Sequence, residues 1–141
     1  MKYFAKITKQ KNHSYVVEFP QLIGCLTEGK NIIQAQKNAH EALNGWLISN
    51  CDRKLNIPEP KILKSPHHYP IDVEPSIAFA IMLRKIRQKK GITQTDLAKK
   101  LKISQQAYAK LETPLITNPS LKTIDKISEA LDVKFYFDLV A

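Results

Sequence analysis

The chain has 141 residues, of which 43% are hydrophobic, and a formal net charge of +9. This composition is typical of a soluble globular protein with one or two small domains, and no apolar stretch approaches the roughly 18 residues that a membrane-spanning helix needs. The apolar run at the N-terminus is too short for a secretory signal, so we expect a cytoplasmic protein with no membrane partner. Two cysteines, Cys25 and Cys51, form neither a disulfide framework nor a Cys-x-x-Cys pair, and we expect reduced thiols that act as small hydrophobic residues.

The first third of the chain predicts strands followed by a helix. Residues 3–8 and 15–19 alternate apolar and polar side chains, which is the period of a strand, and the polar stretch between them predicts a hairpin. Residues 25–28 predict a third, short strand. After Asn31, which is placed to cap a helix, apolar residues recur every three or four positions, and the helix should run to about Asn50. We expect its apolar stripe and Trp46 to lie in the core, with a partner-binding role for Trp46 as the alternative.

Residues 54–70 contain four prolines and no helical period, which predicts an extended connector. Within its last part and just beyond it, residues 69–73 are expected to add one more strand to the first sheet. This places the domain boundary near Glu74 and Pro75 and divides the chain into residues 1–74 and 75–141. The adjacent pair His67-His68 would point apart, with no third ligand nearby in the sequence, so we expect connector residues rather than metal ligands.

The second half predicts helices up to its last residues. Ser76 is expected to cap a helix that ends at Gly91 in the left-handed conformation. Shorter helices are expected at about 94–101, 105–112 and 120–131. The tail, residues 133–140, is rich in β-forming side chains and predicts a terminal strand.

The positive charge is concentrated in one window of this second half. From Arg84 to Lys110 there are nine basic residues and one acid, Asp96, whereas acids outnumber bases from Leu111 onward. Such a window indicates a polyanionic partner, and a solvated surface on a helical bundle is the alternative.

The spacing of residues 93–112 predicts two short helices that interlock at a fixed angle. Leu97 and Leu101 form the inner face of the first helix, and Tyr108 and Leu111 form that of the second. Ala98 is small where the second helix crosses the first, and Ile103 is expected to fill the space inside the turn, where it plugs the gap between the helices. Thr93 and Ser104 are placed to cap the N-termini of the two helices. The second helix then presents a polar outer face of the kind that enters the major groove.

Eight residues of this segment are candidates for contact with DNA. Gln105 and Gln106 begin the second helix, where a glutamine amide can pair with adenine, and Lys110 lies near bases or phosphates on the same face. Gln94, at the N-terminus of the first helix, is placed to bond a phosphate. The whole predicted set is Gln94, Thr95, Ser104, Gln105, Gln106, Ala107, Ala109 and Lys110.

From about Ser76 to Leu131 this pattern resembles the helix-turn-helix domains of the Xre/Cro repressor family. The resemblance implies double-stranded operator DNA as a partner and a homodimer as the binding form. The sequence departs from the family at Lys102, where a glycine is usual; a left-handed conformation there costs another residue roughly 1 kcal/mol. The terminal strand is expected to pair with the same strand of the second protomer in the dimer, because an open apolar edge strand favours association.

The N-terminal part carries an ordered set of motifs: a strand ending in Phe19-Pro20, the turn Leu22-Ile23-Gly24-Cys25, then Thr27-Glu28-Gly29 and an alanine-rich helix. Over about Lys2 to Leu47 this order resembles the HicB antitoxin family. The resemblance implies a partial ribonuclease-H-like module that binds a HicA-like mRNA-cleaving toxin. It also implies that the protein represses the operon that encodes it. Ile23 stands where the family usually has proline, so partner contacts near this turn can differ.

Ribonuclease-H chemistry itself needs clustered carboxylates that hold two metal ions. Residues 2–9 contain no acid, and Glu18, Glu28 and Glu41 are scattered over three elements, so we expect no enzyme, no catalytic residue, no metal and no cofactor. The predicted fold class is α+β: a partial ribonuclease-H-like module of antiparallel strands and one helix, joined to an all-α helix-turn-helix domain with a terminal strand. The predicted function is that of a type II antitoxin, as a homodimer or a higher assembly with toxin; a ligand-responsive repressor without a toxin is the alternative.

Overall fold

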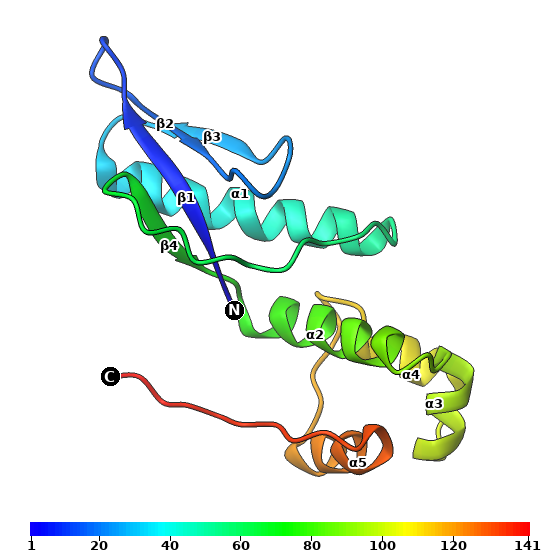
Figure 1. Cartoon of the computed structure of the whole chain (residues 1–141). Helices are drawn as coiled ribbons and strands as arrows, with labels where there is room; N and C mark the ends of the chain where they lie inside the picture. The colour runs from blue at the N-terminus through cyan, green and yellow to red at the C-terminus, as the bar shows by residue number, and fades with distance from the viewer. The chain divides into compact units, whose positions relative to one another are not determined.

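The computed structural model describes residues 1–141, and Figure 1 shows its course. The chain divides into two units, Met1–Ala78 and Phe79–Ala141. The first unit contains an antiparallel sheet and one long helix, and the second contains helices, so the predicted α+β class is confirmed. No helix combines the length and the apolar character needed to cross a membrane.

The sheet of the first unit has four antiparallel strands in the order β3-β2-β1-β4. Ile7 pairs with Val17, Val17 pairs with Thr27, and Tyr3 pairs with Ile71. The predicted hairpin, third strand and added strand are therefore confirmed. The strands are β1 (Lys2–Lys9), β2 (Tyr15–Glu18), β3 (Leu26–Gly29) and β4 (His68–Asp72).

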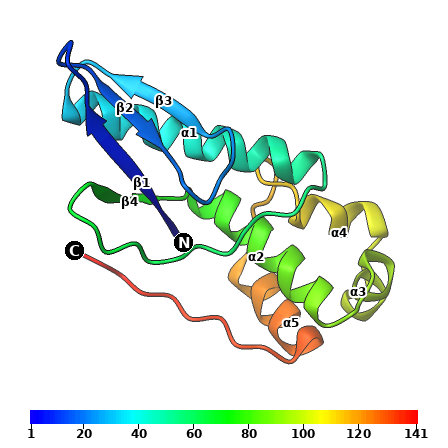
Figure 2. The same ribbon diagram turned by 45° about the horizontal axis from the view of Figure 1, so that its top comes forward.

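Helix α1 (Ile32–Asp52) lies along one face of this sheet, as Figure 2 shows. The strand period buries alternate residues of β1, and the helical period buries one stripe of α1, because apolar side chains gain free energy when they leave water. Asn31 caps the helix as predicted, its side chain accepting a hydrogen bond from the Gln34 amide at 2.8 Å. Just before it, a Cβ on Gly29 would lie 2.4 Å from the backbone nitrogen of Ala35, so only glycine fits there.

The connector between α1 and β4 is held against the first unit by side chains. The Tyr3 hydroxyl donates to the carbonyl of Pro58 at 2.6 Å, and burial together with the nearby Glu59 raises the pKa of Tyr3 to about 12. The connector is shorter than the predicted 54–70, because β4 already begins at His68. Pro70 fits β4 because this strand pairs with β1 alone, and an edge strand tolerates a residue without an amide donor.

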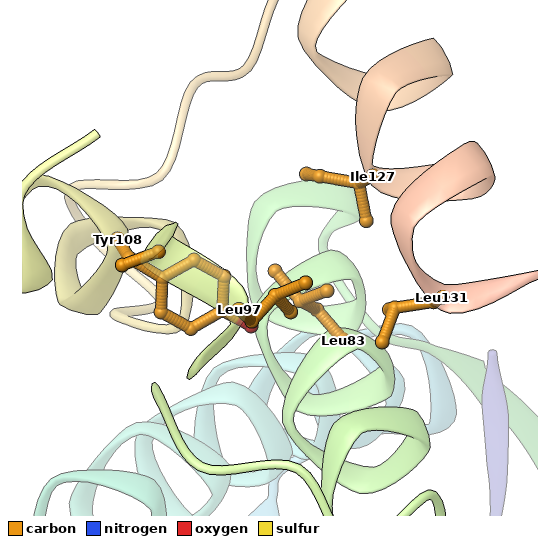
Figure 3. Close-up of a cluster of buried hydrophobic side chains, with 6 residues drawn as sticks. Leu83, Leu97, Tyr108, Ile127 and Leu131 are labelled. Atoms are coloured by element: carbon orange, nitrogen blue, oxygen red, sulfur yellow. The ribbon is translucent and has the colours of Figure 1, made fainter. Parts of the chain in front are cut away.

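The second unit packs its helices around one apolar cluster: α2 (Pro75–Lys89, which begins in the first unit), α3 (Gln94–Leu101), α4 (Gln105–Leu111) and α5 (Leu121–Leu131). In Figure 3 the side chains of Leu83, Leu97, Tyr108, Ile127 and Leu131 converge from the four helices. The predicted helices are confirmed, with small changes at their ends. Ser76 is not the cap of α2, which begins at Pro75; proline suits a first helical position because it has no amide to satisfy.

The predicted terminal strand is wrong for the single chain. Residues 133–141 form no strand, because a strand needs a hydrogen-bonded neighbour and the second unit offers none. In Figure 1 the segment leaves α5 as an extended chain. Phe135 stacks on Phe79 with ring centroids 6.2 Å apart, whereas the exposed fractions beyond it are high: Tyr136 82%, Phe137 67%, Leu139 101% and Val140 93%.

Candidate nucleic-acid interface

Helices α3 and α4 are joined by a turn whose residues stop one helix and start the next. Thr93 and Ser104 cap the two helices as predicted: their hydroxyl oxygens accept hydrogen bonds from the amides of Asp96 at 3.1 Å and Ala107 at 3.0 Å. Lys102 ends α3 in the left-handed conformation, with φ 56° and ψ 40°. The chain therefore reverses its helical hand for one residue, and α4 can begin in a new direction.

The two helices interlock through the predicted side chains. Leu97, Ala98 and Tyr108 are buried, and Leu101 is half-buried beside them. The prediction that Ile103 plugs the turn is only partly right, because its exposed fraction is 38%. The angle between α3 and α4 therefore depends mainly on the buried trio.

The outer face of α4 is polar and accessible. Gln105, Gln106 and Lys110 are exposed, as is Ala107; Thr95 on α3 and the cap Ser104 are exposed as well. Ala109 is half-buried, so it is less accessible than we predicted. A short helix with adjacent amide side chains at its exposed start has the shape and hydrogen-bonding groups for reading base edges.

Gln94 has partners inside the chain. Its side-chain oxygen accepts a hydrogen bond from Nε2 of Gln105 at 3.0 Å, and its own Nε2 donates to Oε2 of Glu112 at 2.9 Å. A side-chain amide carries two N–H donors, so one remains for a phosphate. Gln94 thus restrains Gln105, a role that its sequence position did not reveal.

A buried ion pair that the sequence pattern did not predict lies beneath this face. Arg87 on α2 donates from Nε to Oε1 of Glu112 at 2.5 Å and from Nη2 to Oε2 at 3.0 Å. Both residues are buried, with exposed fractions of 9% and 6%. The sequence did hold a signal: Arg87 follows the buried Leu83 by one helical turn and so belongs to the inner face of α2.

Glu112 also accepts a hydrogen bond from the Tyr108 hydroxyl at 2.7 Å. Burial by itself would raise the pKa of Glu112, but the hydrogen bonds from Arg87, Gln94 and Tyr108 outweigh it and lower the pKa below the ordinary carboxyl value. The hydrogen bond to Glu112 raises the pKa of Arg87, and burial followed by that same carboxylate raises the pKa of Tyr108. The cluster therefore holds a carboxylate and a guanidinium in their charged forms.

The predicted window of nine basic residues does not lie wholly at the surface. Arg87 is buried and neutralised by Glu112, and Arg84 and Lys85 are half-buried. The exposed members are Lys89, Lys90, Lys99, Lys100, Lys102 and Lys110. Lys99 and Lys100 lie on α3, Lys102 lies in the turn and Lys110 lies on α4, so the helix-turn-helix segment carries accessible positive charge.

Elsewhere in the chain, the predicted core role of Trp46 is only partly right, since this residue is half-buried. Cys25 and Cys51 are both buried thiols, and burial raises the pKa of Cys25 to about 11. No three side chains of His, Cys, Asp or Glu gather closely enough to hold a metal ion.

Two family models match this chain. A model of HicB-like antitoxins of bacterial toxin–antitoxin systems matches residues 3–90, and a helix-turn-helix model matches residues 83–137. The chain belongs to the HicB-like antitoxin family. It is an antitoxin of a bacterial toxin–antitoxin system, with a helix-turn-helix DNA-binding domain after the antitoxin module.

Individual relatives of this HicB-like antitoxin include both antitoxins and a transcriptional regulator. Antitoxin HicB of Escherichia coli strain K12 is 28% identical over 111 residues, which are 79% of this chain and 80% of the relative. A UPF0150 protein of Thermoplasma acidophilum is 40% identical over 58 residues, 41% of this chain and 84% of its own. The transcriptional regulator SinR of Bacillus subtilis strain 168 is 32% identical over 54 residues, 38% of this chain and 49% of the regulator.

Proposed function

We propose that this antitoxin represses its own operon by placing α4 in the major groove of operator DNA, and that it neutralises a HicA-like mRNA-cleaving toxin by direct binding. The observation that supports the proposed DNA binding is the hydrogen bond from Gln105 to Gln94, which restrains an exposed amide at the start of a short, capped helix. A restrained side chain loses less conformational entropy when it pairs with a base.

The residues divide into base-reading and backbone-contacting groups. Gln105 and Gln106 read base edges, and Lys110 contacts a nearby base or phosphate. Gln94 uses its second N–H for the DNA backbone while it holds Gln105. Thr95 on α3 is assigned to the same contact with DNA, as are Ser104, Ala107 and Ala109 at and within α4, where small side chains let the backbone of α4 approach the groove.

The DNA-binding proposal is tested by mobility shift with the DNA upstream of this gene and with random DNA. Wild type should prefer the upstream DNA and should dissociate as salt rises. The double variant Gln105→Ala, Gln106→Ala should lose this preference and keep weak binding to both DNAs. Gln36→Ala, an exposed glutamine on α1 of the first unit, serves as the control and should leave the preference unchanged. If the double variant still discriminates as well as wild type, α4 is not the reading element.

Toxin neutralisation is assigned to the first unit and DNA binding and dimerisation to the second; the units divide after Ala78, four residues beyond the boundary predicted between residues 74 and 75. The antitoxin family model covers residues 3–90, which include almost the whole first unit, and the helix-turn-helix model covers residues 83–137 of the second unit. These matches support the assignment of one function to each unit, although the antitoxin match extends to residue 90. Co-expression of the full chain with the small protein encoded beside its gene should restore growth, and the two proteins should purify together. A neighbour that neither binds nor arrests growth would contradict the toxin assignment. We assign this antitoxin no catalytic role, and DNA and mRNA-cleaving partners imply that it acts in the cytoplasm.

The DNA-binding form is proposed to be a homodimer joined by the C-terminal segment. Residues 136–140 are extended and exposed, and all of them except Asp138 are hydrophobic. An unpaired extended segment of this kind favours pairing with the same segment of a second copy. In this arrangement the strand that the single chain lacks would form between two copies.

A further inference from the structure

The loop between β2 and β3 is fixed by its own backbone. The Leu22 amide donates to the carbonyl of Phe19 at 2.9 Å, and the Cys25 amide donates to the carbonyl of Leu22 at 3.0 Å. The Phe19 amide then closes the loop on the carbonyl of Cys25 at 3.2 Å. Phe19, Leu22 and Cys25 are each at least 97% buried, and Gly24 permits the turn with φ +82°. This loop is therefore a rigid part of the first unit.

The side chain of Ile23, in the middle of this rigid loop, points into solvent. Ile23 is 93% exposed between a buried leucine and a glycine. Its backbone carbonyl accepts a hydrogen bond from Nε1 of Trp46 at 3.0 Å, which ties the loop to α1. Gln21 ties the other side of the loop to the connector, donating to the carbonyl of Glu59 at 2.9 Å and accepting from the Lys61 amide at 3.0 Å. The fold thus holds an isoleucine in water although its backbone is fixed on both sides.

Such an arrangement suits protein binding. Burying an exposed aliphatic side chain against a partner is favourable, and a side chain on a fixed loop costs little entropy to immobilise. Trp46 is half-buried beside it, and tryptophan is among the residues most often found at the centre of interfaces. Residues 19–25 carry no charge, so this loop lacks the cations that bind a nucleic acid backbone.

We propose that Ile23, held by this loop and flanked by Trp46, is an anchor that inserts into an apolar socket on the toxin. This inference rests on the proposed binding of a HicA-like toxin by the first unit. A second copy of this chain is the other possible occupant. The toxin is preferred because the loop lies inside the segment matched by the antitoxin family model, whereas the exposed apolar tail that suits a second copy lies in the other unit.

The test uses the full-length antitoxin and a variant of the small protein encoded beside its gene that no longer arrests growth. Binding is measured by calorimetry. Ile23→Ala should raise the dissociation constant at least about tenfold, and Ile23→Asp about a hundredfold or more, because a charge cannot enter an apolar socket. Ile23→Leu should bind within about threefold of wild type, since most of the apolar surface is kept. Ile33→Asp, at another exposed isoleucine of the same unit, is the matched control and should bind as wild type does.

The outcomes separate this inference from the proposed function. If wild type binds the toxin and Ile23→Asp binds it equally well, the anchor is refuted while toxin binding stands. If wild type does not bind the toxin, the proposed function fails and the anchor with it. If Ile23→Asp instead reduces self-association of the antitoxin alone, the loop is a contact between copies and the inference is overturned. Unchanged unfolding temperature and unchanged DNA binding of Ile23→Asp would show that a lost toxin affinity reflects the interface.

Discussion

Arg87 and Glu112, 25 residues apart, form a bidentate ion pair beneath the polar face of α4. The guanidinium also donates from Nη1 to the carbonyl of Ile92 at 2.8 Å, just after α2 ends. The pair therefore joins the end of α2 to the end of α4, and Tyr108 and Gln94 complete the carboxylate's hydrogen bonds. The position of the proposed DNA-reading helix depends on this buried charge pair.

Replacing Arg87 by methionine should destabilise the second unit by about 3–5 kcal/mol, because it leaves the Glu112 carboxylate buried without its cation. The free energy of unfolding is measured by urea denaturation followed by circular dichroism. Trp46 fluorescence serves as the separate probe of the first unit, which should be unaffected. Lys89→Met, an exposed cation on the same helix, should change stability by less than about 0.5 kcal/mol. Equal losses in the two variants would contradict a special role for the ion pair.

The second unit should lose stability in acid because of Glu112. The pKa of this carboxyl is lower in the folded chain than its ordinary value of 4.5, so its contribution is present above pH 4.5 and is lost as the pH falls through the folded value. Urea denaturation across this range should show the fall in wild type and a flatter profile in Glu112→Gln, which is already destabilised at neutral pH. The exposed Asp125→Asn variant should keep the wild-type profile. A Glu112→Gln profile as steep as that of wild type would assign the acid sensitivity to other groups.

Replacing Lys102 by glycine should stabilise the second unit by about 0.5–1 kcal/mol, because glycine adopts the left-handed conformation at this position without strain. Lys100→Gly removes the same charge two residues earlier, inside α3, and should destabilise by about 0.5–1 kcal/mol. The two variants are compared by thermal and urea denaturation. Shifts of the same sign would show that charge, rather than backbone conformation, decides the effect.

Gln94→Ala should weaken operator binding by about fivefold, the equivalent of one lost hydrogen bond. The loss should be much smaller in a chain that already carries Gln105→Ala, because Gln94 acts largely through Gln105 and only the proposed contact of its second N–H with the DNA backbone remains. Fluorescence anisotropy measures the affinity of wild type, the two single variants and the double variant for operator and random DNA, which together form a double-mutant cycle. A loss of equal size on random DNA and in the Gln105→Ala background would instead identify a direct phosphate contact as the main role of Gln94.

Removing residues 136–141 should weaken the dimer by at least about tenfold, since the deleted segment holds the exposed apolar side chains and leaves the Phe79–Phe135 stack in place. Sedimentation equilibrium measures the dimer dissociation constant. Lys134→Ala changes an exposed charged residue of the same segment and should leave the dimer intact. Dimers that survive the deletion at the wild-type concentration would place the interface on another surface.

Features that depend on neighbours in the chain could be predicted from the sequence. The period of β1 and the caps at Asn31, Thr93 and Ser104 follow from interactions within a few residues, and the structure contains all of them. The left-handed conformation of Lys102 is expected only from the family resemblance, because the family usually has glycine at this position. The ordered motifs of the first unit and the spacing of the two short helices also predicted the family, which the comparisons confirm.

The tertiary structure alone decided which distant side chains meet. Arg87 reaches Glu112, Gln94 holds Gln105, and Trp46 holds the loop of Ile23, and each contact depends on the angle at which packed elements cross. The terminal segment likewise could not be predicted from its own residues, since β-forming residues make a strand only where a second strand is available for hydrogen bonding. Sequence patterns report local conformational preference, whereas buried pairs, restrained side chains and strand partners depend on the packing of the whole unit.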